Sequence, residues 1–230
     1  MKEFIGESVF FGAAISILTY EIGLFLRKKT KLAIFHPMLL AMALLIVILV
    51  ALDIPYESYY QGAKYISYLL TPATVCLAIP LYEQVELLKK HSGAIAAGIL
   101  SGVITSVLCI LGMSILFGLD HAEYVTLLPK SITTAIGMAL SEELGGYATI
   151  TVAVIAITGV FGNLVTEIVC RVFRIEEPIA KGIGIGTASH AMGTTKAIEM
   201  GEIEGAMSSL SIAMAGLLTV IAAPVFANFL

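Results

Sequence analysis

Polar side chains crowd the segment that follows Pro129. Lys130, Ser131, Thr133 and Thr134 come within five positions of this proline, and proline suits the first turn of a helix. The free N–H groups of a helix start, the helix dipole, hydroxyls and an ammonium together favour an anion. The alternative is a capped helix end whose lysine reaches toward the lipid headgroups. We interpret the segment as an anion-binding site.

A second polar segment, GTASHAMGTT, covers residues 186–195. Its candidate contact residues are Ser189, His190, Thr194 and Thr195. Histidine titrates near neutral pH, so His190 could carry a proton or bind a carboxylate. The alternative is an interior histidine that satisfies a structural hydrogen bond. The glycines of the segment permit close helix contact or unwinding.

A third candidate is the TPAT stretch at residues 71–74. A break there would turn carbonyls and the hydroxyls of Thr71 and Thr74 toward a cavity, whereas an ordinary proline kink would not. Among the acidic residues near the ends of apolar stretches, Glu142 is the candidate for proton coupling together with His190. The alternative to proton coupling is that Glu142 is an ordinary carboxylate in a turn.

Catalytic and metal-binding motifs are missing from the sequence. No zinc-protease or phosphate-loop motif occurs, and no spacing of His, Cys or acidic residues suits a metal. Cys76, Cys109 and Cys170 lie in apolar surroundings with no paired spacing, which argues against a disulfide framework. We therefore expect no cofactor, no metal and no enzymatic activity.

The composition indicates a protein that lies in lipid. Of 230 residues, 58% are hydrophobic and 13% charged, and the mean hydropathy is +0.97. A soluble chain is nearer half apolar and a quarter charged. The net charge is −4 and the basic residues are scattered, so a nucleic acid is not an expected partner. The expected partner is the lipid bilayer.

Stretches without Asp, Glu, Lys or Arg locate the membrane spans, because charge is costly in hydrocarbon. A first span covers 8–26, interrupted by Glu21, and the other long stretches are 32–52, 65–82, 91–119, 144–166 and 205–230. Two charge-free stretches, 131–141 and 182–195, are shorter than the roughly 17–25 residues that cross a bilayer. Polar backbone survives at that depth only inside protein or beside a cavity. The sequence predicts an all-α, polytopic membrane protein with about seven to eight membrane segments, including broken or re-entrant helices.

Basic residues predict the orientation of the first span. Arg27, Lys28, Lys29 and Lys31 follow it, so this turn should be cytoplasmic and the N-terminus outside. Lys89 and Lys90 mark a second cytoplasmic turn. A third, near Arg171, fits only if residues 129–146 enter and leave on one side, or if the positive-inside rule does not hold there.

The chain is expected to form a single integral membrane domain over residues 1–230. Residues 1–60 supply a scaffold of two spans, and residues 61–230 supply the interrupted helices. A weak internal repeat relates residues 71–98 to residues 186–211, because each runs from an interrupted polar segment into a long span. Repeats of this kind occur in many secondary transporters.

The interrupted segments also resemble a known family. The similarity to the LrgB/CidB family rests on PATVCLAIPLY (72–82), LPKSITT (128–134), SEELGG (141–146), GTASHAMGTTKAIEMGEIEGA (186–206) and GLLT (216–219). It runs over most of residues 60–230 and less distinctly over the first two spans. Ala135 stands where the family pattern suggests proline, which leaves open how sharply the chain breaks there.

The resemblance implies two functions. The family is described as antiholin-like or holin-like, tied to murein hydrolase export and lysis. It also resembles the C-terminal half of the plastidial glycolate/glycerate transporter, and relatives are linked to pyruvate movement. A smaller membrane protein of the LrgA/CidA kind is implied as a partner.

The main prediction from the sequence is a carrier for small carboxylates in the cell (inner, cytoplasmic) membrane, with proton coupling through His190 or Glu142. A homodimer is expected. The alternative is a holin-like or antiholin-like component of lysis control. An intramembrane enzyme is a third reading, disfavoured by the missing motifs.

Overall fold

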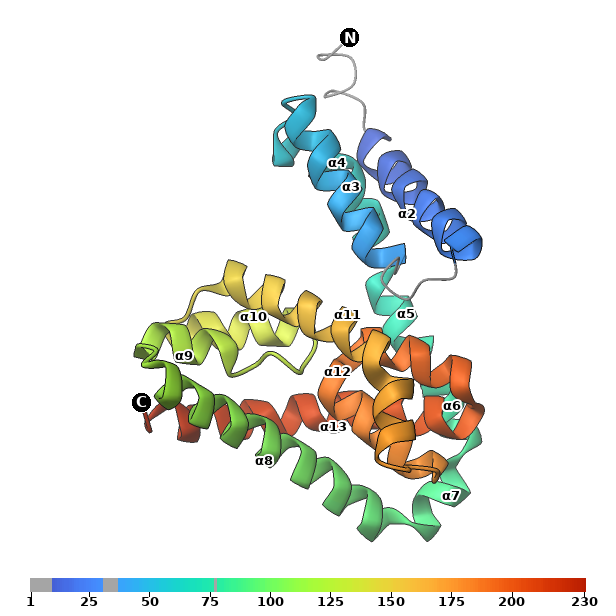
Figure 1. Ribbon diagram of the computed structural model, residues 1–230, viewed down its shortest axis with the longest axis vertical. Coiled ribbons are helices and arrows are strands. Elements are labelled where there is room, and N and C mark those ends of the chain that lie inside the picture. The colour runs from blue at the N-terminus through green and yellow to red at the C-terminus, as the bar shows by residue number, and fades with distance from the viewer. Residues whose placement is uncertain (1–9, 31–36, 77) are drawn as a thin grey trace. The chain divides into compact units, whose positions relative to one another are not determined.

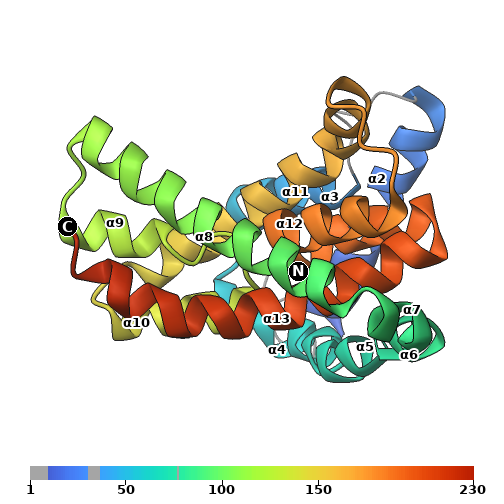
Figure 2. The same cartoon turned by 90° about the horizontal axis from the view of Figure 1, so that it is seen from below.

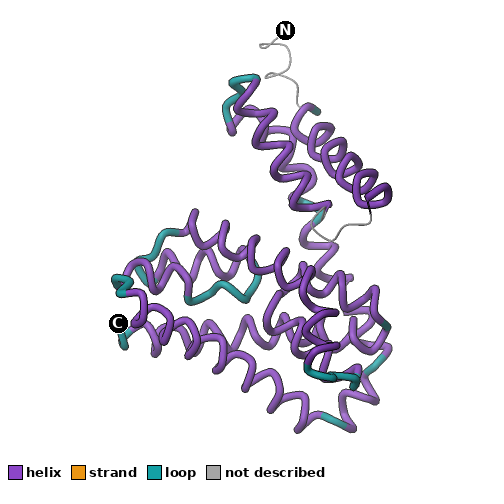
Figure 3. The backbone as a smooth tube through the Cα atoms, in the orientation of Figure 1, coloured by secondary structure: helices purple, strands orange, loops and turns teal. Residues whose placement is uncertain are grey.

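The computed structural model describes residues 10–30, 37–76 and 78–230, without the side chains of Leu70, Thr71, Thr74, Pro80 and Leu81. Within these ranges the regular structure is helical and contains no strand (Figure 3). The chain forms two compact units, Met1–Cys76 and Leu77–Leu230. The fold class predicted from the sequence is thus confirmed, and each unit packs its own helices.

The first unit packs apolar helices through small residues. Its helices are α2 (Phe11–Thr30), α3 (Pro37–Ala51), α4 (Tyr56–Ser67) and α5 (Leu70–Cys76). Gly12 of α2 lies against the carbonyl oxygen of Tyr59, where a Cβ would collide with the backbone of α4. Close approach of this kind drives helix association in lipid. Ser16 Oγ and the Tyr59 hydroxyl also lie 2.9 Å apart, which adds a polar tie between α2 and α4.

The second unit contains the longest helices of the described chain (Figure 1). Its helices are α6 (Ala78–Glu83), α7 (Val85–Lys90), α8 (Ser92–Phe117), α9 (His121–Leu127), α10 (Thr134–Glu143), α11 (Ala148–Val172), α12 (Pro178–Met200) and α13 (Glu202–Ala227). Within the described ranges, α8, α11 and α13 each have 25 or 26 residues and a hydropathy that suits a bilayer crossing. The first unit adds the shorter apolar helix α3, of 15 residues.

Helix α8 supplies one wall of the core of this unit. Its buried residues Ile95, Ile99, Val103 and Val107 recur every four positions, which places them on one side of the helix. They belong to the same core as the fully buried Tyr124 of α9. Helix α8 ends at Gly118, whose φ of 65° is a left-handed conformation that glycine adopts without strain.

Helices α9 and α10 form a hairpin of short helices. They have 7 and 10 residues, far fewer than the roughly 20 that cross a bilayer. Asp120 begins α9 with a capping box, accepting from the Glu123 N–H at 2.8 Å. The loop between the two helices lies inside the unit (Figure 3). Helix α9 begins beside the C-terminus in the two ribbon views (Figure 1 and Figure 2). The prediction that 131–141 is too short to cross is confirmed.

Buried hydroxyls close the base of the hairpin. Thr151 Oγ1, on α11, lies 2.9 Å from the Thr126 carbonyl and 2.7 Å from Ser141 Oγ. Thr126 Oγ1 in turn accepts from the Tyr147 N–H at 2.7 Å. These contacts join α9, α10 and α11 and satisfy the buried hydroxyls of Thr126, Ser141 and Thr151 without water.

Helix α12 is interrupted, and it packs closely on α13. His190 has φ 42° and ψ −141°, so two helical pieces meet at this residue. The prediction of a broken segment within 182–195 is therefore confirmed. Gly182 and Gly186 lie against α13, where a Cβ on Gly182 would come within 2.6 Å of Met207 Cβ.

The TPAT stretch behaves differently from the expectation. Residues 71–74 lie inside α5, which is helical from Leu70 to Cys76. A break at these four residues is therefore wrong, because proline at the third position of a short helix needs no internal hydrogen bond there. The side chains of Thr71 and Thr74 lie outside the described residues.

Candidate functional site

The tip of the α9–α10 hairpin carries the first predicted segment. Lys130 is partly buried, and its Nζ donates to Ser131 Oγ at 2.7 Å. Ser131 Oγ lies 3.3 Å from Ser106 Oγ of α8, so the tip is tied to that helix. Within the described residues, the ion pairs formed by carboxylates do not include Lys130. The ammonium therefore lacks a counter-charge from this part of the chain.

His190 lies at the break in α12 and is fully enclosed. It is 3% exposed, and its Nε2–H donates to the Ile155 carbonyl of α11 at 3.0 Å. A neutral imidazole that donates from Nε2 carries a lone pair on Nδ1. That nitrogen makes no hydrogen bond to the described chain. His190 is thus positioned through one of its two ring nitrogens.

The hairpin tip and the break lie near each other. Gly137 packs against both Pro129 of the tip and Ile155, the residue whose carbonyl accepts from His190. Residues 191–200 begin a new helix after the break, and its first N–H groups have no partner earlier in that helix. A cation, a helix start and an imidazole therefore border one region of the second unit.

The other predicted hydroxyls of α12 mainly support the break. Thr194 is buried, donates to the His190 carbonyl at 3.0 Å and lies 2.7 Å from Ser208 Oγ of α13. Thr195 is exposed and donates to the Met192 carbonyl at 2.7 Å. Ser189 is buried against Gly162, where a Cβ would overlap Ser189 Oγ.

Three predicted residues make no side-chain hydrogen bond within the described chain. Thr133 precedes α10 without capping it, and Thr134 is the exposed first residue of that helix. Glu142 is exposed at the far end of α10, near the hairpin base, about 12 Å of helix away from Thr134. The structure therefore does not place Glu142 with His190.

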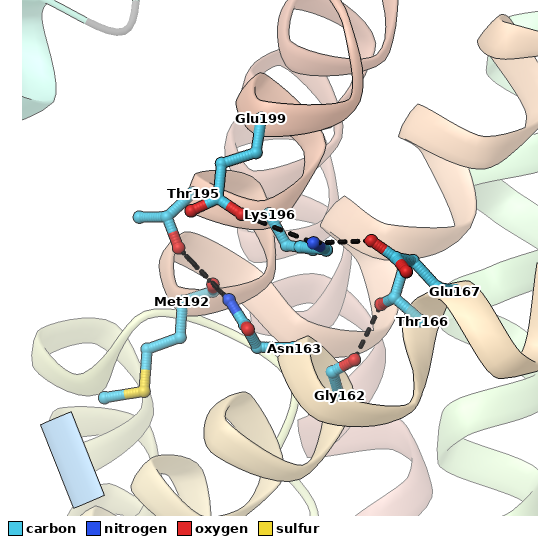
Figure 4. Close-up of polar contacts among 8 residues, drawn as sticks. All are labelled: Gly162, Asn163, Thr166, Glu167, Met192, Thr195, Lys196 and Glu199. Atoms are coloured by element: carbon cyan, nitrogen blue, oxygen red, sulfur yellow. Dashed lines mark hydrogen bonds and ion pairs between the residues drawn. The ribbon is translucent and has the colours of Figure 1, made fainter. Parts of the chain in front are cut away.

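Three residues of α11 support the break in α12. Asn163 of α11, 8% exposed, donates to the Met192 carbonyl at 2.8 Å (Figure 4). Gly159 and Gly162 of α11 leave the space that His190 and Ser189 occupy; a Cβ on Gly159 would lie 2.6 Å from His190 Cε1. The Gly-x-x-Gly-Asn spacing on an apolar helix is the signal that would have found them.

Known proteins resemble this chain over nearly its whole length. A family model described as the LrgB-like family matches residues 16–229. The "Antiholin-like protein LrgB" of Bacillus cereus (strain B4264) is 40% identical over 222 residues, which cover 96% of each chain. A protein of the same name from Bacillus anthracis (strain CDC 684 / NRRL 3495) matches equally, at 40% over 222 residues. No solved structure matches the chain.

Proposed function

This chain belongs to the LrgB-like family, and from that premise we propose that it acts as an antiholin-like component of the cell membrane. In this role it works with a smaller membrane protein of the LrgA/CidA kind and limits murein hydrolase export and lysis. The proposal is supported by relatives named antiholin-like protein LrgB, whose similarity covers 96% of the chain. These names favour the lysis-related alternative over the carboxylate carrier that was the main prediction from the sequence.

The antiholin-like role is tested by dye release from liposomes. The LrgA/CidA-type partner is reconstituted alone and together with this chain, and release of a trapped dye is measured. An antiholin-like protein lowers the release caused by the partner. Equal release with and without this chain would rule out the proposed role.

A second candidate function, a carrier for small carboxylates, is favoured by one observation. Lys130 is a partly buried ammonium with no carboxylate partner in the described chain. Uncompensated charge at membrane depth is costly and commonly marks a substrate or ion pathway. A carboxylate of two or three carbons would supply the counter-charge, and the helix start after His190 would add N–H donors.

Uptake of labelled pyruvate or glycolate into proteoliposomes tests the carrier. Lys130→Met removes the ammonium and should lower uptake at least about tenfold, since a charge-assisted contact contributes roughly 1.5–3 kcal/mol. Lys90→Met, on the exposed end of α7, is the matched control and should leave uptake unchanged. Saturable uptake by the natural chain that survives in Lys130→Met would show that this ammonium does not bind the substrate.

The two functions predict different conductance. A carrier shows saturable flux without large currents, whereas a pore component assembles into large, poorly selective openings. Single-channel recordings on the reconstituted chain therefore separate them. Absence of substrate-specific flux, with and without the partner, would eliminate the carrier.

A further inference from the structure

Two polar side chains on one face of α11 hold the second piece of α12, residues 191–200. Asn163 and Glu167 lie four positions apart on α11, so they project from the same side of the helix. Asn163 Nδ2 donates to the Met192 carbonyl at 2.8 Å and to Thr195 Oγ1 at 3.2 Å. Glu167 faces Lys196 one turn further along (Figure 4).

The ion pair between Glu167 and Lys196 joins two helices. Lys196 Nζ lies 2.6 Å from Glu167 Oε1, with side chains 16% and 55% exposed. Lys196 is also 3.3 Å from Glu199 Oε2, but Glu199 lies on the same piece of α12. A mostly enclosed ammonium needs a nearby counter-charge. Glu167 is therefore the carboxylate that fixes Lys196, and residues 191–200 with it, against α11.

The backbone at both ends of residues 191–200 departs from a helix. At the start, His190 has φ 42° and ψ −141°. At the end, Gly201 is extended, with φ 167° and ψ 165°. The helix is thus interrupted between this piece and residues 178–189. Contacts with neighbouring helices also hold this piece: Thr194 Oγ1 lies 2.7 Å from Ser208 Oγ of α13, and Ile198 packs against Gly205 of α13.

We propose that Asn163 and Glu167 are positioning residues that form a clasp on α11, and that residues 191–200 turn about His190 when the clasp opens. The clasp sets the shape of the break beside Lys130. The inference does not depend on whether the protein acts as an antiholin-like component or as a carrier.

Hydrogen–deuterium exchange of the full chain in lipid nanodiscs tests the clasp. Glu167→Gln should speed exchange in residues 191–200 by about three- to twenty-fold, the span that interhelical polar contacts in membranes cover. Exchange in residues 178–189 should stay unchanged. Glu199→Gln is the matched control, because it removes a carboxylate from Lys196 without touching α11, and it should leave both segments unchanged.

Asn163→Ala provides a second, independent arm. It should speed exchange in the same segment, whereas Thr166→Ala should not. Thr166 is equally buried on α11, but its hydroxyl donates to the Gly162 carbonyl of its own helix at 2.6 Å. This pair separates loss of the clasp from loss of any buried polar group on α11.

If Glu167→Gln fails to fold, the charge-reversed double variant, Glu167→Lys with Lys196→Glu, tests the clasp instead. Protection of residues 191–200 in the double variant supports the clasp. If residues 191–200 exchange as fast in the double variant as in a chain without the Glu167–Lys196 ion pair, the proposal is overturned. Equal acceleration by Glu167→Gln and Glu199→Gln, or acceleration spread over all of 178–200, overturns it as well.

Discussion

At the scale of single residues, His190 combines an unfavourable backbone with favourable side-chain contacts. Its φ of 42° with ψ of −141° is a conformation that glycine adopts easily and other residues adopt at a cost. The ring hydrogen bond to the Ile155 carbonyl and the space left by Gly159 offset that cost. The histidine is therefore retained for its ring, since the backbone alone would prefer glycine.

This conflict predicts the order of stability of two variants. Both His190→Gly and His190→Ala lose the ring, but alanine keeps the Cβ that makes a positive φ costly. His190→Gly should be more stable than His190→Ala by about 1 kcal/mol. Thermal unfolding in detergent micelles measures the difference.

The control is Ala188, an exposed helical position of α12. Ala188→Gly should be destabilising by about 1 kcal/mol, since glycine weakens an ordinary helix. The backbone argument fails if glycine is the less stable choice at both positions.

At the scale of helices, the hairpin depends on hydroxyls that come from three elements. Thr126, Ser141 and Thr151 are each 0–2% exposed, so water cannot replace a lost partner. Such networks cost more when one member is removed than an exposed hydrogen bond does.

Thr151→Val should therefore loosen the hairpin while preserving the shape of the side chain. Ser141 Oγ and the Thr126 carbonyl lose a partner, and the expected cost is about 1–3 kcal/mol. Hydrogen exchange should rise in residues 121–143 and not in α13. Thr149→Val, an exposed position two residues away, is the control. Unchanged exchange in the Thr151 variant would show that the network does not hold the hairpin.

The sequence predicted the helices better than the contacts between them. The long charge-free stretches located α8, α11 and α13. The two charge-free stretches that are too short to cross a bilayer identified the hairpin and the broken α12. Each inference follows from the cost of polar groups in lipid. The site of the break did not follow, since four glycines within 182–193 were equally suitable. Ile155 and Gly159 of another helix accommodate the His190 ring, and a single sequence does not reveal such pairings. Ser106 and Ser208 were missed for the same reason.

At the scale of the whole molecule, the described chain is largely apolar outside as well as inside. Exposed large hydrophobic residues occur along every long helix, among them Leu100, Phe161 and Leu217. With lipid as solvent these side chains need no protein partner. The second unit is held together by the close packing of its apolar core and small residues and by internal polar contacts.

The distribution of basic residues predicts how the first unit crosses the membrane. Arg27, Lys28 and Lys29 lie in the last turn of α2, so that end should face the cytoplasm. Lys28→Cys should react with a membrane-impermeant thiol reagent from the cytoplasmic side. Leu52→Cys, an exposed position after α3, should react from the outside. The reverse pattern would invert the orientation, and the natural cysteines are replaced in both variants.

The hairpin base has a consequence for how the protein is made. The Thr126 hydroxyl donates within α9, to the Ala122 carbonyl, but its Oγ1 also accepts from the Tyr147 N–H and its carbonyl accepts from Thr151 of α11. A chain emerging from the ribosome therefore exposes α9 and α10 before the helix that satisfies them exists. Neither piece can be released into lipid alone. The insertion machinery must shelter residues 121–143 until α11 arrives, so α8 and α11 enter the bilayer first and the hairpin folds between them.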